Sequence, residues 1–322
     1  MTVTETLPSK GDASATPGVD NHPEVKVRPM WEQVILCFFV GGPTAMLFVA
    51  PLVLGLVCGL WPTLLDCILA IVFYAISAGG VTIGLHRYFT HGSFKAKRPL
   101  KLALGIAGSF AVQGPITRWV ADHRKHHKFS DKEDDPHSPY RYGQGFWAMT
   151  RGFVWSHLWW LFDREQTSLK QFAPDLVEDP DVRQIDRWFP VWTVLTFALP
   201  ALIGGLVTLS WVGALSAFIW AGVVRVAVVH HVTWSINSIC HIWGKRPFKS
   251  RDDSRNVWWL SVFSLGESWH NLHHADQTCA RHGVDRWQVD ISARLIALFE
   301  HFGWAHDVRW PTKERLNAKR AN

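Results

Sequence analysis

The stretch VILCFFVGGPTAMLFVAPLVLGLVCGL (34–60) leads through Trp61-Pro62 into TLLDCILAIVFYAISAGGVTIGL (63–85). No lysine or arginine interrupts it, and it is about twice as long as one bilayer crossing requires. Two buried helices of a soluble core are the alternative, but soluble helices this long normally show a polar face. We therefore predict a helical hairpin that crosses the membrane and returns at Trp61-Pro62. Asp66 is expected close to this turn, where water can reach it.

A second uncharged run reads FPVWTVLTFALPALIGGLVTL (189–209) and, after a break at Ser210-Trp211, continues as VGALSAFIWAGVV (212–224). This run predicts another hairpin. Neither turn carries positive charge, whereas the sequence outside the hairpins is rich in lysine and arginine. Because positively charged loops stay on the cytoplasmic side, both termini and the two segments that follow the hairpins are expected in the cytoplasm.

The predicted fold is an all-α membrane protein with four transmembrane helices in two hairpins and a cytoplasmic helical cap. The predicted spans are 34–60, 63–85, 189–209 and 212–230, and the cap comprises 86–188 and 231–310. This single integral-membrane domain (31–310) lies between a disordered N-terminal tail (1–30) and a polar C-terminal tail (311–322). The apolar run 100–116 is short and interrupted by Gly and Pro, so we expect it at the interface or against the cap, and not as a fifth span.

The composition agrees with a membrane protein. Nineteen tryptophans and nineteen phenylalanines favour membrane–water boundaries and buried apolar tunnels. The charged fraction of 19% lies below the ~25% that is typical of soluble domains. The net charge of +6 could suit nucleic acid, but it suits a membrane protein that follows the positive-inside rule equally well. We expect membrane lipid as a partner and no nucleic acid. The five scattered cysteines show neither zinc-ligand spacing nor an even count, so we interpret them as small hydrophobic residues.

Nine of the 17 histidines gather in four short stretches outside the predicted membrane core. These stretches are HRYFTH (86–91), HRKHH (123–127), NSICH (237–241) and HNLHH (270–274). Imidazole suits iron, zinc, copper and nickel. Zinc needs about four ligands, so nine histidines are too many for one ion and about right for two. A lone pair of histidines can arise by chance or on a solvent-exposed surface. Several clusters predicted on the same side of the membrane are harder to explain in that way.

Helix spacing gives these stretches a geometry. Residues three or four apart share a helix face, so His123 and His127 can converge on one point while His126 leans to a neighbouring one. The set HNLHH repeats this pattern, and Asn237 and His241 are also four apart. His86 and His91 are five apart, so they can serve two centres, or the helix ends between them. The nearby carboxylates are candidates for orienting the imidazoles; they are Asp122, Asp134, Asp135 and Glu267.

The remaining histidines show no such pattern, except for the pair at 230 and 231, and we interpret them as structural or surface residues. They are His22, His137, His157, His230, His231, His282, His301 and His306.

With these boxes the sequence resembles the membrane-bound acyl desaturases of the stearoyl-CoA Δ9 type. HRYFTH resembles the family's HRxxxH, and WVADHRKHHKFSDKEDDPH its WxxDHRxHHxxxxxxxDPH. HHVTWSINSICHIWG resembles HHxTWxxNSxxHxxG, and GESWHNLHH resembles GEGxHNxHH with Ser268 in place of the second Gly. The resemblance runs from about 43 to about 304, and the joint pattern is specific.

The resemblance implies a four-helix membrane stem and a cap that holds two irons. It maps the family's iron ligands onto His86, His91, His123, His126, His127, His241, His270, His273 and His274, and a metal-bound water onto Asn237. The implied reaction uses O₂ and two electrons to convert two adjacent methylenes of a saturated C16 or C18 chain into a cis double bond, at the Δ9 position. A metal has to carry this chemistry because acid–base side chains cannot attack an unactivated C–H bond.

The resemblance also points to substrate-binding residues. Gln113, Trp119 and Thr233 correspond to residues around the bend of the acyl chain. Asp122 and Trp234 match residues near the thioester. Tyr74 and Ala78 lie where family members close the far end of the tunnel. For each aromatic residue, membrane packing is the simpler alternative.

Two departures concern the partners. Ala121 stands where acyl-CoA desaturases commonly carry an arginine, and Arg164 is the nearest candidate for the basic pair that follows the second box. This leaves the acyl carrier open between coenzyme A, which we expect, acyl carrier protein and a glycerolipid. No fused cytochrome b5 motif is present, so we expect electrons from a separate ferredoxin or a flavin/iron–sulfur reductase, with an acidic surface that fits a basic cap.

The main rival function is a histidine-rich di-iron hydroxylase or monooxygenase, in which the same oxidant returns oxygen to the chain. The box HHVTWSINSICH favours desaturation. A metal transporter or metal sensor is a rival of another class, and it predicts ionisable residues within the spans. Apart from Asp66, the predicted spans hold almost none.

Overall fold

The protein is mostly helical in the computed structural model, which describes residues 26–321. In this part of the chain four helices are long and apolar enough to cross a membrane: Met30–Val57, Leu64–Thr90, Phe189–Thr208 and Trp211–Ile242. The second and fourth helices extend past the predicted ends of their spans, so that His86 and His241 lie on the same helices as the spans. A rigid helix therefore connects the apolar stem to the histidines.

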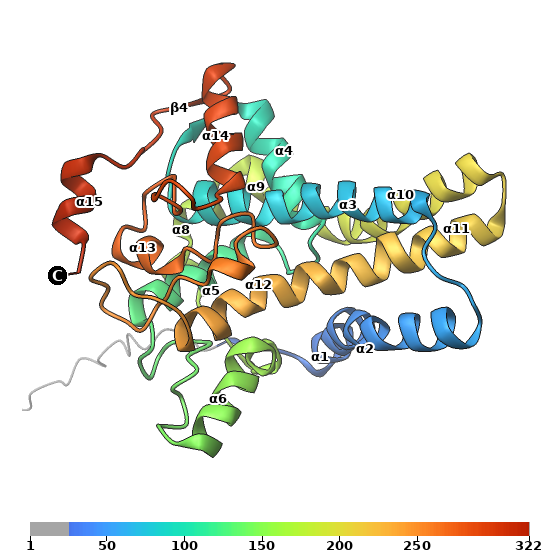
Figure 1. The fold of residues 1–322 in the computed structure, drawn as a ribbon, viewed down its shortest axis with the longest axis horizontal. Coiled ribbons are helices and arrows are strands. Elements are labelled where there is room, and N and C mark those ends of the chain that lie inside the picture. The colour runs from blue at the N-terminus through green and yellow to red at the C-terminus, as the bar shows by residue number, and fades with distance from the viewer. Residues whose placement is uncertain (1–25, 322) are drawn as a thin grey trace, which may run out of the picture.

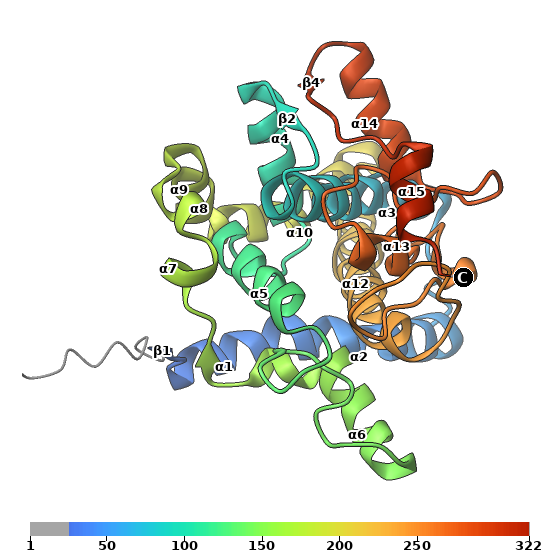
Figure 2. The same ribbon diagram turned by 90° about the vertical axis from the view of Figure 1, so that its left-hand side faces the viewer.

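The first long helix contains α1 (Met30–Leu36) and α2 (Gly42–Val49), the second α3 (Leu64–Gly79), the third α10 (Phe189–Thr208), and the fourth α11 (Trp211–Ala217) and α12 (Arg225–Ile242). Helices α10 and α11 pack on each other, whereas α12 lies between α2 and α3 (Figures 1 and 2). The two-hairpin arrangement in a bilayer and its sidedness remain predictions.

Helix α3 begins at a polar cap. The Thr63 hydroxyl accepts the backbone N–H of Asp66, and the Asp66 carboxylate accepts the backbone N–H of Thr63 at 2.9 Å. Ser216 on α11 donates to the same carboxylate at 2.7 Å. Asp66 is therefore buried, not open to water as the sequence led us to expect, because it both caps α3 and links it to the fourth span.

The fourth span contains a charge, directly after the uncharged run 212–224. Arg225 is buried at the start of α12 and donates to the carbonyl of Ala221, to the carbonyl of Phe110 and to the Thr196 hydroxyl. These neutral acceptors join α12 to α10 and to the end of α4. Neither Arg225 nor Asp66 lines the large cavity described below.

The remaining elements are short and surround one end of the long helices. The helices are α4 (Arg98–Ser109), α5 (Ile116–Phe129), α6 (Phe146–His157), α7 (Leu169–Phe172), α8 (Pro174–Glu178), α9 (Pro180–Arg187), α13 (His270–Ala275), α14 (Ile291–His301) and α15 (Lys313–Lys319). The strands form two antiparallel pairs, β1 (Lys26–Val27) with β3 (Glu165–Gln166) and β2 (Lys95–Ala96) with β4 (Ala305–His306). Helix α4 covers most of the interrupted run 100–116 and packs against α3 and α9.

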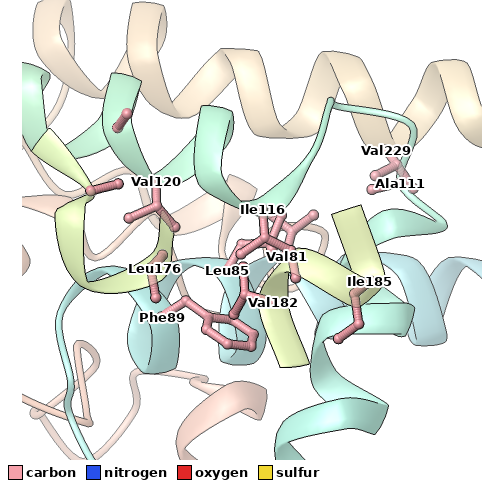
Figure 3. Close-up of a cluster of buried hydrophobic side chains, with 12 residues drawn as sticks. Val81, Leu85, Phe89, Ala111, Ile116, Val120, Leu176, Val182, Ile185 and Val229 are labelled. Carbon is pink, nitrogen blue, oxygen red and sulfur yellow. The ribbon is translucent and has the colours of Figure 1, made fainter. Parts of the chain in front are cut away.

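An apolar core fixes α5 against the end of the second span. Val81, Leu85 and Phe89 meet Ile116 and Val120 of α5, and residues of α8 and α9 close the other side (Figure 3). At the start of α5 the Asp186 carboxylate accepts the backbone N–H groups of Ile116 and Thr117, at 2.7 and 3.1 Å. This cap and this core hold the helix that carries HRKHH in a fixed position.

The predicted tails differ in what the structure shows. Residues 1–25 of the predicted N-terminal tail lie outside the described residues. Its last residues are ordered, since β1 pairs with β3 and the first helix begins at Met30. The predicted C-terminal tail contains α15, whose Arg315 forms an ion pair with Asp276.

Candidate metal centre and acyl cavity

The nine histidines form two groups whose ligand nitrogens lie within 4.8 Å of one another. The five-histidine group contains His86, His91, His123, His127 and His273. The four-histidine group contains His126, His241, His270 and His274. The sequence spacing explains this division, because His123 and His127 share one face of α5 while His126 lies on the next.

Each group draws on several elements, and two helices serve both. Helix α5 contributes to the five-histidine group and, through His126, to the four-histidine group. Helix α13 does the reverse, because His270 and His274 share one group while His273 joins the other. His86 and His91 belong to the same group because Gly80–Thr90 is a π-helix, in which side chains five residues apart share a face; the His91 N–H donates to the His86 carbonyl at 3.2 Å. The α-helical spacing that would separate these two side chains does not apply here.

The donor atoms fit metal ions. In the five-histidine group, the Nε2 atom of His273 lies 3.0 Å from that of His86 and 2.9 Å from that of His127. In the four-histidine group, the Nε2 atoms of His270 and His274 are 3.0 Å apart. The Nε2 atoms of His91 and His241 are buried with no hydrogen-bond partner. Nitrogens that converge in this way, with buried donors left unpaired, match the requirement of a metal ion for lone pairs.

Burial keeps five of these imidazoles neutral, which is the form that binds metal. Burial and the neighbouring imidazoles lower the pKa of His123, His127 and His273 well below the ordinary value of 6.5. The same causes act on His91 and His270. At neutral pH the lone pairs of these five side chains are therefore free for a ligand.

Carboxylates orient three of the four imidazoles in the four-histidine group. The Nδ1 atom of His126 lies 3.0 Å from Asp135, that of His241 lies 3.1 Å from Asp131, and that of His274 lies 2.6 Å from Asp252. Burial alone would raise the pKa of Asp135, but His126 outweighs it and holds that pKa below its usual value. Carboxylates in this position fix the tautomer, so that Nε2 faces the metal position.

In the five-histidine group one carboxylate contacts a ligand candidate, and it is shared with a cation. Glu267 contacts Nδ1 of His86. Its carboxylate also accepts hydrogen bonds from Nε and Nη2 of Arg87, at 3.0 and 2.9 Å. The fully buried Arg87 also pairs with Asp290 at 3.1 Å. Burial raises the pKa of Glu267, yet His86 and Arg87 lower it below the ordinary range, so the carboxylate remains charged. His282 completes this cluster, 3.5 Å from Glu267.

A cavity of about 700 Å³ runs past the histidines. Four of its residues, Tyr74, Ala78, Thr82 and His86, follow at intervals of four along α3 and its continuation, so one helix face lines the cavity. All seven residues that the resemblance assigned to the substrate line this cavity; they are Tyr74, Ala78, Gln113, Trp119, Asp122, Thr233 and Trp234. Asn237 and His270 also line it.

A hydrogen-bonded group of cavity-lining residues lies beside the five-histidine group. Gln113 donates to the Thr233 hydroxyl at 3.0 Å and accepts the indole N–H of Trp119 at 3.0 Å. The Trp119 ring stacks on His123, with 5.0 Å between the ring centroids. Val112, which precedes Gln113, has φ +57°, a strained value for a β-branched residue. The turn that carries Gln113 is thus held in one conformation by its neighbours.

A polar mouth adjoins the other end of the cavity. Its basic side chains are Arg28, Arg118, Lys125 and Arg141. Arg118 donates to the Thr167 carbonyl at 2.6 Å, and Asp122 lies between the mouth and the cavity. Burial raises the pKa of Asp122, with Arg118 opposing that effect. Arg164, which the sequence suggested for this role, does not line the mouth.

A family model described as "Fatty acid desaturase" matches residues 60–310. The chain belongs to the fatty acid desaturase family. "Delta-9 acyl-lipid desaturase 1" of Arabidopsis thaliana is 40% identical over 291 residues, which cover 90% of each chain. "Hex-5-enoyl-[acyl-carrier protein] acetylenase" of Moorena producens is 40% identical over 254 residues, 78% of this chain and 79% of the relative. "Acyl-CoA C20 Delta5-desaturase" of Anemone leveillei is 35% identical over 280 residues, 85% and 81% of the two chains.

Sequence reasoning missed several side chains of this desaturase. Of the four carboxylates that it suggested, Asp135 and Glu267 contact histidines, while Asp122 and Asp134 line the polar mouth instead. Asp131 and Asp252 were not identified, because each reaches a histidine more than 20 residues away. His282 and His137 were interpreted as structural or surface residues, yet His137 stacks on His126 with 4.2 Å between centroids. The contact between His137 and His126 joins two residues that do not share one short histidine stretch, so the spacing within a stretch cannot predict it.

Proposed function

We propose that this desaturase introduces a cis double bond, at the Δ9 position, into a saturated C16 or C18 acyl chain. Two electrons, O₂ and two protons enter for each double bond, and two waters leave. The observation that supports this proposal is the position of Trp119 in the cavity wall. Trp119 stacks on His123, so an acyl chain that occupied the cavity would carry its methylenes past the histidine groups.

Two irons would occupy the two histidine groups, and Asn237 would hold a metal-bound water near the four-histidine group. Bound iron supplies the activation of O₂ that removal of hydrogen from unactivated methylenes requires. The chain's own residues do the rest. Gln113, Thr233 and Trp119 fix the turn of the acyl chain, and this position selects the carbon pair. The apolar walls exclude water from the site, which protects the oxidised centre.

The acyl carrier that we propose is coenzyme A. Arg28, Arg118 and Lys125 in the mouth support it as partners for the anionic end of a thioester, in a lining that also contains six carboxylates. The printed names of the relatives mention acyl lipid, acyl carrier protein and acyl-CoA. We therefore propose to offer the purified enzyme stearoyl-CoA, stearoyl-acyl carrier protein and a stearoyl glycerolipid, each with the same electron donor. Faster turnover of either other substrate would contradict the proposal for the carrier.

We propose further that the long helices span the membrane as two hairpins within a single domain, 31–310. Both termini, the histidine groups and the mouth would face the cytoplasm. The separate electron donor, a ferredoxin or a flavin/iron–sulfur reductase, would dock on this side. Labelling of single cysteines near each terminus in sealed, oriented cells tests the sidedness.

Expression in a desaturase-deficient host, followed by mass spectrometry of the fatty acids, tests the reaction. We expect new cis-9 C16 or C18 species. Hydroxylated chains in their place would overturn the proposal in favour of a monooxygenase. A His127→Ala variant serves as the matched control, and full activity in it would remove this residue from the iron site.

A further inference from the structure

We propose that the segment Trp258–Phe263 inserts into the bilayer and forms a lipid-facing wall at the far end of the acyl cavity. This segment belongs to the part of the chain that the sequence assigned to the cytoplasmic cap. The insertion into the bilayer requires only that α3 spans the membrane. The role as a wall of the acyl cavity rests on the proposed function.

The segment is apolar in a place where a water-exposed loop would be polar. Trp258, Trp259, Val262 and Phe263 are each between 51% and 69% exposed. Four large apolar side chains in six residues form an exposed patch that water does not favour. Tryptophan is also the residue most enriched where proteins meet the membrane–water boundary.

A contact with the second span shows how deep the segment reaches. The Tyr74 hydroxyl donates to the Phe263 carbonyl at 2.5 Å. Tyr74 precedes His86 by 12 residues, within the long helix Leu64–Thr90. Side chains tilt toward the N-terminus of a helix, here the end of α3 away from the histidines. Phe263 therefore lies about halfway along the span, at the level of the exposed Ile71 and Val72 of α3.

Several backbone groups of the segment are hydrogen-bonded within the protein. Ser261 and Ser264 donate their N–H groups to the carbonyls of Trp258 and Leu260, at 3.2 and 2.9 Å. The Ser261 carbonyl accepts the backbone N–H of Gly266 at 2.8 Å, and the Val262 carbonyl accepts that of Leu265 at 3.2 Å. The Phe263 carbonyl accepts the Tyr74 hydroxyl. Unpaired backbone groups are costly in hydrocarbon, and these hydrogen bonds reduce that cost.

The segment also reaches the cavity. Phe263 lines it together with Tyr74 and Ala78, whereas the neighbouring Val262 does not. The end of the acyl chain would thus meet a wall made by α3 and by this segment. Phe263 then helps to set how long a chain fits, and Val262 faces lipid.

The depth is tested without reference to activity. The exposed Cys37, Cys58 and Cys67 are replaced by alanine, and a nitroxide is attached to Val262→Cys in phosphatidylcholine nanodiscs. Lys95→Cys in β2 is the water-exposed control, and Trp259→Cys is a second probe in case one variant misfolds. We expect the label at 262 to collide with O₂ more often, and with a water-soluble nickel chelate several-fold less often, than the label at 95. Equal nickel collision at the two sites would overturn the insertion. Low collision with both reagents would show that another protein surface covers the segment, and would overturn the lipid assignment.

The wall is tested by products. Phe263→Ala should shift the ratio of C18 to longer desaturated chains toward the longer ones, while Val262→Ala should leave the ratio unchanged. An unchanged ratio in Phe263→Ala would overturn the role of this segment as a wall of the acyl cavity. If the wild-type chain desaturates nothing, the proposed function fails, but the nitroxide result still decides whether the segment inserts.

Discussion

The two histidine groups solve the same problem differently. The four-histidine group has carboxylates behind three of its imidazoles, from Asp131, Asp135 and Asp252. The five-histidine group has one more imidazole but a single carboxylate, Glu267, whose charge is offset by Arg87. A carboxylate behind an imidazole raises its basicity and fixes its orientation. The comparison suggests that four imidazoles suffice to bind a metal ion where carboxylates support them. The five-histidine group would then depend on its larger number of imidazoles.

This difference predicts how each group responds when it loses a ligand. His274→Ala leaves three imidazoles and a buried Asp252 without its partner, so we expect the chain to retain one iron and desaturation to fall by more than about 100-fold. His91→Ala leaves four imidazoles in its group, and we expect both irons to remain with a smaller loss of activity. Iron per chain and product yield measure both effects. Iron loss from His91→Ala but not from His274→Ala would reverse the comparison.

Changing the carboxylates separates metal binding from folding. Asp252→Asn should weaken iron binding by about 10–100-fold in a chelator challenge, since it removes the acceptor behind His274. Glu267→Gln removes one of the two acidic partners of the buried Arg87, so it should lower the free energy of unfolding of the iron-free protein by about 3–5 kcal/mol. Equal thermal stability of Glu267→Gln and the wild type would show that Glu267 acts on the metal alone.

Acid should loosen the four-histidine group through α12. Burial, and the proximity of His231, lower the pKa of His157 to about 4, and its Nδ1 atom lies 2.9 Å from the Ser238 hydroxyl on the helix that carries His241. A histidine whose folded-state pKa is lowered contributes stability that is complete above about pH 6.5 and is lost as the pH falls toward 4. We expect the melting temperature of the iron-free protein to drop between pH 6.5 and 4.5, and to drop less in His157→Gln. Identical pH profiles would exclude this contact as a cause.

The smallest effect concerns the helix that both groups share. Asp186→Ala removes the cap of α5 and should cost about 1 kcal/mol of stability. Because α5 supplies both groups, we expect the iron of both to become easier to remove, by the same factor. Asp186→Asn retains an acceptor and is the matched control. Selective loss from one group would show that α5 does not couple them.

Much of this arrangement could be predicted from the sequence. Helix spacing separates His126 from the pair formed by His123 and His127, and the uncharged runs predict the four long helices, because both signals are local. The partners of the imidazoles could not be predicted. Asp131 reaches His241 across 110 residues, and Asp252 reaches His274 from a loop, so these pairs depend on packing. Phe263 was assigned to the cap for the same reason, since its contact with Tyr74 joins residues 189 positions apart.

The most direct test of the central claim is an anomalous difference map, collected at the iron absorption edge, from crystals of the iron-loaded protein. The two-group arrangement predicts two peaks, one surrounded by the Nε2 atoms of the five-histidine group and the other by those of the four-histidine group. A single peak between the groups, or a signal at the zinc edge alone, would contradict a di-iron desaturase centre built in this way.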